Sequence, residues 1–179
     1  MNPREIGQKQ PAFLLAQVGA HAASQFAERL EVLELTPADA GILRLLRTDA
    51  GVSQQELAVR LQIHPSRLVA ILDNLENRGC IERRANPDDR RLSSLHLTQA
   101  GGETLEKIGM VARQHQEALL SSLSAEERNT LAALLLRIAD QQGLARGIHP
   151  GYQRLGRPSR SKAREGKNDG KSAEESDER

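Results

Sequence analysis

The sequence predicts a mainly α-helical protein with one small β-hairpin. Aromatic residues make up only 2% of the 179 residues, and Trp is absent. A core so poor in aromatic side chains must be built from Leu, Ile, Val and Ala, which suits packed helices better than sheets. Apolar residues also recur at steps of three and four along most of the chain, which is typical of amphipathic helices.

The N-terminal part predicts two helices in succession. Apolar residues at helical spacing mark a long amphipathic helix over residues 11–33. Thr36 and Pro37 then supply an N-cap and a proline at the first helical position. The second helix therefore starts at Pro37, and we expect it to end near Gly51.

Two shorter helices follow in the order of a helix-turn-helix. Ser53 and Glu56 form a capping box that starts a helix over residues 54–61. Pro65 fits the first turn of the next helix, which is expected to run to about Asn77. The apolar side chains of this last helix fall on one face, so its other face is free to enter a groove of duplex DNA.

A hairpin and two more helices complete the predicted fold. Residues 80–84 and 93–98 are expected to be short strands, because turn residues separate them and Gly79 ends the preceding helix. Thr98 opens a further long helix, and Ser124 begins the last one with a second capping-box pattern.

The composition along the chain predicts three segments. Residues 1–10 are expected to form a flexible arm, and residues 11–145 the folded domain. Residues 146–179 are rich in Gly, Ser and charged residues, so we expect a disordered charged tail. The basic first part of the tail either adds sequence-independent phosphate contacts or only keeps the protein soluble.

Charge, cysteine content and hydropathy limit the function classes. The net charge is only +1, so any signal for nucleic acid must come from the distribution of charge. A single Cys fits a reducing cytoplasm, and no apolar run approaches the roughly 18 residues of a membrane-spanning helix. No catalytic motif, phosphate-binding glycine loop or metal-ligand spacing is present. We therefore expect a cytoplasmic protein that is not an enzyme and uses no cofactor or metal.

One set of motifs carries a family resemblance. It comprises Glu56-Leu57-Ala58, Leu61, Leu75-Glu76, Arg78-Gly79, Ile81-Glu82-Arg83, Pro87-Asp88-Asp89-Arg90-Arg91, Leu97-Thr98 and Gly101. In this order and spacing, the chain from Pro11 to Ala145 resembles the MarR family of winged helix-turn-helix regulators, named for multiple antibiotic resistance.

The resemblance implies a homodimer that binds DNA. Residues 11–35 and 99–145 would be the dimerisation helices, and residues 36–98 the DNA-binding core. Two winged motifs would sit on adjacent major grooves of a pseudo-palindromic double-stranded operator. Family members commonly repress transcription, and many release DNA when a small hydrophobic or phenolic effector binds between the dimerisation and DNA-binding regions. The matching recognition-helix positions are Pro65, Ser66, Arg67, Val69 and Ala70, and the matching wing positions are Arg84, Asp89, Arg90 and Arg91.

The chemistry of these residues gives a separate reason to expect DNA contacts. Arg67 lies one turn from the start of its helix, where a guanidinium can pair with guanine O6 and N7 in the major groove. Ser66, Ser53 and Gln54 are better suited to phosphates than to bases, because they lie at helix N-termini. The alternative is that Arg67 only solvates an exposed face.

The predicted wing carries several arginines around its turn. A tip arginine can insert into a narrow minor groove, where the negative potential is enhanced. Arg90 is the first candidate, and Asp89 beside it can fix the direction of its side chain. Arg83 is a candidate for a role in the fold instead. The alternative is a solvated hairpin with incidental charge.

Some positions depart from the family pattern. Val69 and Ala70 stand where members often have a polar or basic residue. Apolar contacts to thymine methyl groups can take the place of the missing polar contacts to bases. His64 replaces the usual small hydroxyl residue of the turn. Cys80 can be interpreted as a redox switch, but its apolar surroundings favour a buried, unreactive thiol. For the whole chain, the alternative function is a winged-helix protein-docking module that does not bind DNA.

Overall fold

The computed structural model describes residues 10–85, 93–144 and 147, and the fold is mainly helical, as predicted. In this part of the chain there are six helices: α2 (Pro11–Glu31), α3 (Pro37–Thr48), α4 (Gln54–Leu61), α5 (Pro65–Asn77), α6 (Gln99–Leu119) and α7 (Ala125–Gln141). Three short strands, β1 (Val52–Ser53), β2 (Ile81–Ala85) and β3 (Ser93–Leu97), form one antiparallel sheet in the order β1-β3-β2.

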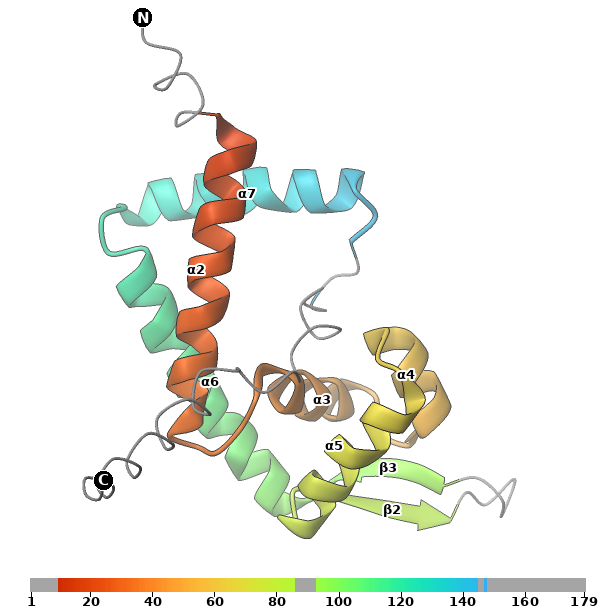
Figure 1. The fold of residues 1–179 in the computed structure, drawn as a ribbon. Helices are drawn as coiled ribbons and strands as arrows, with labels where there is room; N and C mark the ends of the chain where they lie inside the picture. The colour runs from red at the N-terminus through yellow and green to blue at the C-terminus, as the bar shows by residue number, and fades with distance from the viewer. Residues whose placement is uncertain (1–9, 86–92, 145–146, 148–179) are drawn as a thin grey trace, which may run out of the picture.

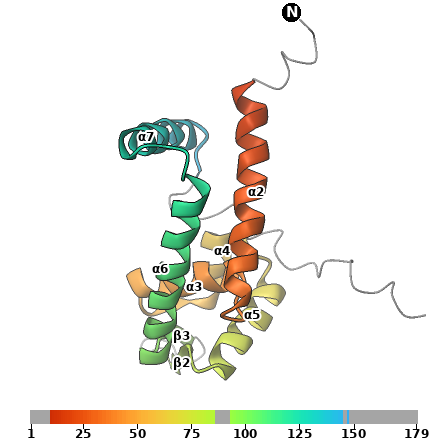
Figure 2. The same ribbon diagram turned by 90° about the vertical axis from the view of Figure 1, so that its left-hand side faces the viewer.

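The long helices and the smaller elements occupy different parts of the molecule (Figure 1). α2 packs against α6, and α7 lies across the upper end of α6 (Figure 2). α3, α4, α5 and the sheet gather around the lower ends of α2 and α6. The helix-turn-helix and the wing therefore lie at the end opposite α7.

Three helices begin at reciprocal capping boxes. In each, a hydroxyl accepts a hydrogen bond from the amide three residues later, and a carboxylate there accepts one from the amide of the capping residue. The pairs are Thr36 with Asp39, Ser53 with Glu56 and Ser124 with Glu127. The predicted helix starts are thus confirmed. The hydrogen bond from the serine amide, with a further contribution from the serine hydroxyl, lowers the pKa of Glu56 and that of Glu127.

The core is aliphatic, as the composition predicts. Its largest fully buried side chains are Leu30, Ile42, Leu43, Leu46, Leu57, Leu61, Leu68, Leu72, Leu75, Ile81 and Leu95. Phe26 is only partly buried and packs against this cluster from outside. Cys80 is buried with 4% of its surface exposed, which confirms the buried thiol.

The sheet contains the predicted hairpin and one further strand. β2 and β3 pair with Ile81 opposite Leu97, close to the predicted bounds. β1 was not predicted, and it pairs Val52 with Leu95. A two-residue strand that ends in a helix cap shows no alternation of apolar and polar residues, so the sequence pattern could not indicate it.

Gly101 allows α6 to start directly against the wing. A Cβ atom at this position would lie 1.9 Å from the carbonyl oxygen of Cys80. The Thr98 amide donates to that same oxygen over 3.1 Å, and the Thr98 hydroxyl donates to the Gly79 carbonyl over 2.6 Å. The first turn of α6 is therefore fixed to the chain that enters β2.

Candidate nucleic-acid interface

The turn between α4 and α5 sets the direction of α5. Gln62 ends α4 in the left-handed conformation, with φ of 52°. The Ile63 amide then donates to the Ala58 carbonyl over 3.1 Å, and its side chain is buried. His64 is the N-cap residue of α5, and its Nδ1 lies 2.8 Å from Oγ of Ser66.

The two faces of α5 differ as predicted. Leu68, Leu72 and Leu75 are fully buried and dock the helix on the core. The predicted recognition-helix residues belong to the first two turns: Pro65, Ser66, Val69 and Ala70 are exposed, and Arg67 is half-buried. The fold therefore presents most of this set to solvent.

Ser53 and Gln54 lie at the N-terminus of α4, and both are half-buried. The Ser53 hydroxyl donates to Glu56 Oε2 over 2.9 Å and accepts from the Glu56 amide over 3.2 Å. A phosphate contact by this hydroxyl would therefore compete with the helix cap.

Arg83 connects the wing to α5. Its Nη2 donates to Asp73 Oδ1 over 2.6 Å, and its Nη1 pairs with the Glu76 carboxylate. The Arg83 backbone amide also donates to Glu76 Oε1 over 3.2 Å. These bonds confirm the role in the fold that we considered for Arg83.

Arg84, the next residue of β2, is exposed. Its Nε donates to Glu82 Oε1 over 2.9 Å, and the two side chains are 59% and 44% exposed. An ion pair this exposed is worth about 1 kcal/mol or less, so Arg84 can exchange it for a phosphate. The remaining predicted wing residues, Asp89, Arg90 and Arg91, lie outside the described residues.

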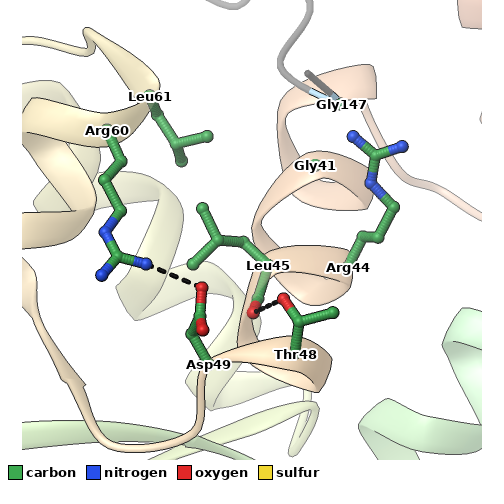
Figure 3. Close-up of a pocket in the computed structure, with 8 residues that line it drawn as sticks. All are labelled: Gly41, Arg44, Leu45, Thr48, Asp49, Arg60, Leu61 and Gly147. Carbon is green, nitrogen blue, oxygen red and sulfur yellow. Dashed lines mark hydrogen bonds and ion pairs between the residues drawn. The ribbon is translucent and has the colours of Figure 1, made fainter. Parts of the chain in front are cut away.

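A surface pocket of about 320 Å³ lies between α3 and α4 (Figure 3). Arg44 and Arg60 contribute two guanidinium groups, and Leu45 and Leu61 contribute apolar surface. Arg60 Nη1 donates to Asp49 Oδ2 over 2.7 Å. Arg44, Asp49 and Arg60 belong to no sequence motif, so no pattern marked the polar residues of this pocket in advance.

Two half-buried side chains with nitrogen donors, Arg29 of α2 and His115 of α6, lie at the junction of these helices. Arg29 Nε and His115 Nδ1 are buried nitrogen atoms that have no hydrogen-bond partner among the described residues. The Phe26 and His115 rings lie with their centroids 5.6 Å apart. Burial, followed by the charges of Arg29 and His21, lowers the pKa of His115. No sequence pattern marks Arg29 and His115 as one site, since residues distant in the chain meet here.

The described part of the chain contains neither a group of metal ligands nor a membrane-spanning helix. Within residues 10–85, 93–144 and 147, no group of His, Cys, Asp or Glu side chains is arranged to hold a metal ion. Across the same residues, no helix combines the length and the apolar composition that a bilayer crossing requires.

Known proteins share this arrangement. A model described as MarR family matches residues 33–92. The chain is 35% identical over 121 residues to a proposed transcriptional regulatory protein for the hcr operon of Thauera aromatica. The aligned region covers 67% of this chain and 73% of that protein. The chain is 34% identical over 113 residues to the multiple antibiotic resistance protein MarR of Escherichia coli (strain K12). That aligned region covers 62% of this chain and 78% of the relative. The chain belongs to the MarR family.

The MarR-family fold also extends beyond the matched segment. The transcriptional repressor CouR, solved bound to a 23-mer DNA duplex, is similar with a TM-score of 0.66 at 31% identity. This similarity covers 78% of the chain and 98% of CouR. MarR-family relatives are named as transcriptional regulators and not as enzymes, so the chain is a winged-helix transcriptional regulator.

Proposed function

We propose that this regulator represses transcription as a homodimer that binds a pseudo-palindromic double-stranded operator through α5 and the wing. The observation that carries the proposal is α5, which has a fully buried leucine face and an opposite face exposed at its N-terminal turns. CouR has a similar fold and was solved on a DNA duplex, which supports the same kind of partner here.

In this proposal, the N-terminal turns of α5 read bases in the major groove. Arg67 pairs with guanine, and the small apolar side chains of Val69 and Ala70 contact thymine methyl groups. Pro65 and Ser66 contact the DNA backbone at the N-terminus of α5. The Ser66 Oγ also lies near His64 Nδ1. Ser53 and Gln54 at the start of α4 also meet phosphates.

The wing adds contacts that are largely independent of sequence. Arg84 exchanges its exposed pair with Glu82 for a phosphate. Arg90 enters the minor groove beside Asp89, and Arg91 binds a neighbouring phosphate. If a dimer neutralises roughly 8 phosphates, the logarithm of the affinity should fall with the logarithm of salt at a slope of about 7.

The exposed apolar side chains of the long helices support the homodimer. No residue of α7 is fully buried against the described part of its own chain. Large apolar residues are exposed on α7 at Leu134, Leu135, Leu136 and Ile138, and on α2 at Phe13, Leu14, Leu15 and Val18. Covering each of these side chains would contribute about 1 kcal/mol. A second copy of the chain, bound through α2 and α7, would bury them.

We also propose that the small hydrophobic or phenolic effector expected from the family resemblance carries an acidic group and binds at the α2–α6 junction. A carboxylate or phenolate would accept hydrogen bonds from Arg29 and His115, and an aromatic body would lie against Phe26. Because an anion favours the charged imidazole, its binding should raise the pKa of His115 and should be tighter at pH 6 than at pH 8. Calorimetry with benzoate, and with benzamide as the neutral control, measures this. Equal binding of both molecules at both pH values would contradict an acidic effector.

Selection from random duplexes tests the DNA proposal, and it also distinguishes it from the docking module. We expect the protein to act in the cytoplasm. The full chain is used to select duplexes from a random pool. The affinity for the selected sequence is then measured at several salt concentrations. We expect two related half-sites and a steep salt dependence. A selection that enriches no sequence, or binding that is insensitive to salt, would favour the protein-docking alternative.

A further inference from the structure

Arg78 joins the end of the recognition helix to the end of the first long helix. It is the residue that follows α5, and its Nη2 donates to the Leu33 carbonyl over 2.8 Å. Its Nη1 donates to the carbonyl of Glu34. Leu33 and Glu34 lie in the turn that follows α2, so one guanidinium spans the two helix ends.

Both helix ends are closed by the same backbone motif. After α2, the Leu35 amide donates to Leu30 and the Glu34 amide to Glu31, with Glu34 left-handed at φ 53°. After α5, the Cys80 amide donates to Leu75 and the Gly79 amide to Glu76, with Gly79 at φ 68°. These are the bonds of Schellman motifs. Each end is thus a rigid turn, and Arg78 bridges two rigid turns.

The bridge is suited to the charge at the end of α2. Carbonyl groups at a helix C-terminus have no intrahelical donor and carry the negative end of the helix dipole. A planar guanidinium donates to two such oxygens at once, whereas an ammonium group acts as a point charge. The left-handed conformation of Glu34 is unfavourable for a residue with a side chain, and the bond to its carbonyl helps to hold it.

α2 and α5 pack mainly against other elements, so the Arg78 hydrogen bonds connect two separate parts of the fold. α2 packs mainly against α6 and α3, while α5 packs mainly against α4 and β2. Arg78 is therefore a direct polar connection between two elements that have few other contacts with each other.

We propose that Arg78 is a positioning residue that fixes the recognition helix to the dimerisation helix, and so sets the half-site spacing the dimer accepts. This inference rests on the proposed DNA-binding homodimer. In a symmetric dimer, the separation of the two recognition helices depends on how each α5 is held relative to α2. Two half-sites about one duplex turn apart match only one such arrangement.

The test uses the selected operator and derivatives in which one base pair is added or removed between the half-sites. One base pair changes the separation by about 3.4 Å and the relative rotation by about 34°. For the wild-type chain, we expect at least a tenfold loss of affinity for each altered spacing. For Arg78→Ala, we expect weaker binding to the matched operator and less than a threefold difference among spacings.

We define the spacing ratio as the affinity for the matched operator divided by the affinity for an operator of altered spacing. This ratio distinguishes a positioning role of Arg78 from a general contribution to stability. A mutation that only lowers the fraction of folded protein reduces the affinity for all spacings by the same factor. Arg60→Ala is the matched control, because it removes an exposed guanidinium from the DNA-binding region that is paired with Asp49 and not with α2. We expect Arg60→Ala to keep the wild-type ratio, and Arg78→Lys to give an intermediate one.

The outcomes are distinct. A folded Arg78→Ala dimer that discriminates spacings as well as the wild type overturns the inference. If Arg78→Ala does not fold, Arg78→Lys and Arg78→Gln are judged by the same ratio. If the wild-type chain selects no DNA, the proposed function itself is wrong, and this inference falls with it.

Discussion

The guanidinium of Arg83 on β2 donates to the carboxylate of Asp73 on α5 over 2.6 Å. The same side chain pairs with Glu76, so the base of the wing is held against the recognition helix by charge-assisted hydrogen bonds. With 24% of its surface exposed, the Arg83 side chain is mostly shielded from solvent and from phosphates. Arg83 and Arg84 are adjacent, yet they should respond differently to mutation.

Arg83→Ala should reduce the stability of the fold and leave the electrostatics of DNA binding unchanged. We expect a loss of about 1 kcal/mol in the free energy of unfolding, measured by urea titration. The slope of affinity against salt should stay at the wild-type value. A reduced slope would show that Arg83 contacts DNA directly.

Arg84→Ala should give the opposite pattern. The exposed pair with Glu82 contributes little to stability, so unfolding should change by less than about 0.5 kcal/mol. Loss of one phosphate contact from each protomer should lower the salt slope by about 2. Glu82→Gln is the control, because it frees Arg84 without removing its charge. An unchanged slope for Arg84→Ala would exclude it from the phosphate contacts.

Arg67→Ala should change which sequence is bound as well as how tightly. A bidentate contact to guanine is worth about 1–3 kcal/mol of discrimination. A repeated selection with the variant should therefore lose a guanine preference at one symmetric pair of positions. Should the variant select the wild-type operator with uniformly lower affinity, Arg67 would be a phosphate contact instead.

Two neighbouring glycines of α6 should differ sharply in their tolerance of Ala. A Cβ at Gly101 would approach the Cys80 oxygen to 1.9 Å, so Gly101→Ala should cost about 3 kcal/mol or prevent folding. The first atom near a Cβ at Gly102 is Arg47 Nη1 at 3.9 Å, an ordinary contact. Gly102→Ala should therefore stabilise the helix by about 0.5–1 kcal/mol. Similar unfolding midpoints for the two variants would contradict this packing.

The Glu127 capping box predicts a pH dependence at the acid side. Hydrogen bonds from Ser124 lower the pKa of Glu127 below its usual value of 4.5. The ionised carboxylate therefore stabilises the folded chain above about pH 4.5, and this contribution is lost as the pH falls through the lowered pKa. Glu127→Gln should be less stable than the wild type at pH 7, and the difference should shrink below pH 4.5. Glu126→Gln is the control, because it removes a neighbouring carboxylate that makes no capping hydrogen bond. All variants are compared at equal protein concentration.

Helix starts and the core could be predicted from the sequence because their causes are local. A hydroxyl followed three residues later by a carboxylate, or a proline at a first turn, acts within one helical turn. Thr36, Ser53 and Ser124 therefore mark real helix starts. The leucine face of α5 follows from periodicity in the same way.

The candidate site could be predicted only in part. The exposed first turns of α5 follow from the buried leucine face, but the partners of Arg78, Arg83 and His115 depend on how distant segments pack. Arg78 precedes a helix-ending glycine, and in the sequence it stands out only as part of a motif. Its bonds to Leu33 and Glu34 join residues far apart in the chain, and no spacing rule describes such a contact.

The exposure of α7 has a consequence for how much active protein a cell contains. Most of the stability of a helix in a protein comes from tertiary packing, and no residue of α7 is fully buried within the described chain. If the proposed homodimer forms through α2 and α7, the ordering of α7 is linked to the binding of a second copy, and dilution loosens this end of the molecule. Newly made, scarce chains would be exposed to proteolysis until their concentration permits pairing. Degradation would then set a threshold of synthesis below which the regulated genes stay active.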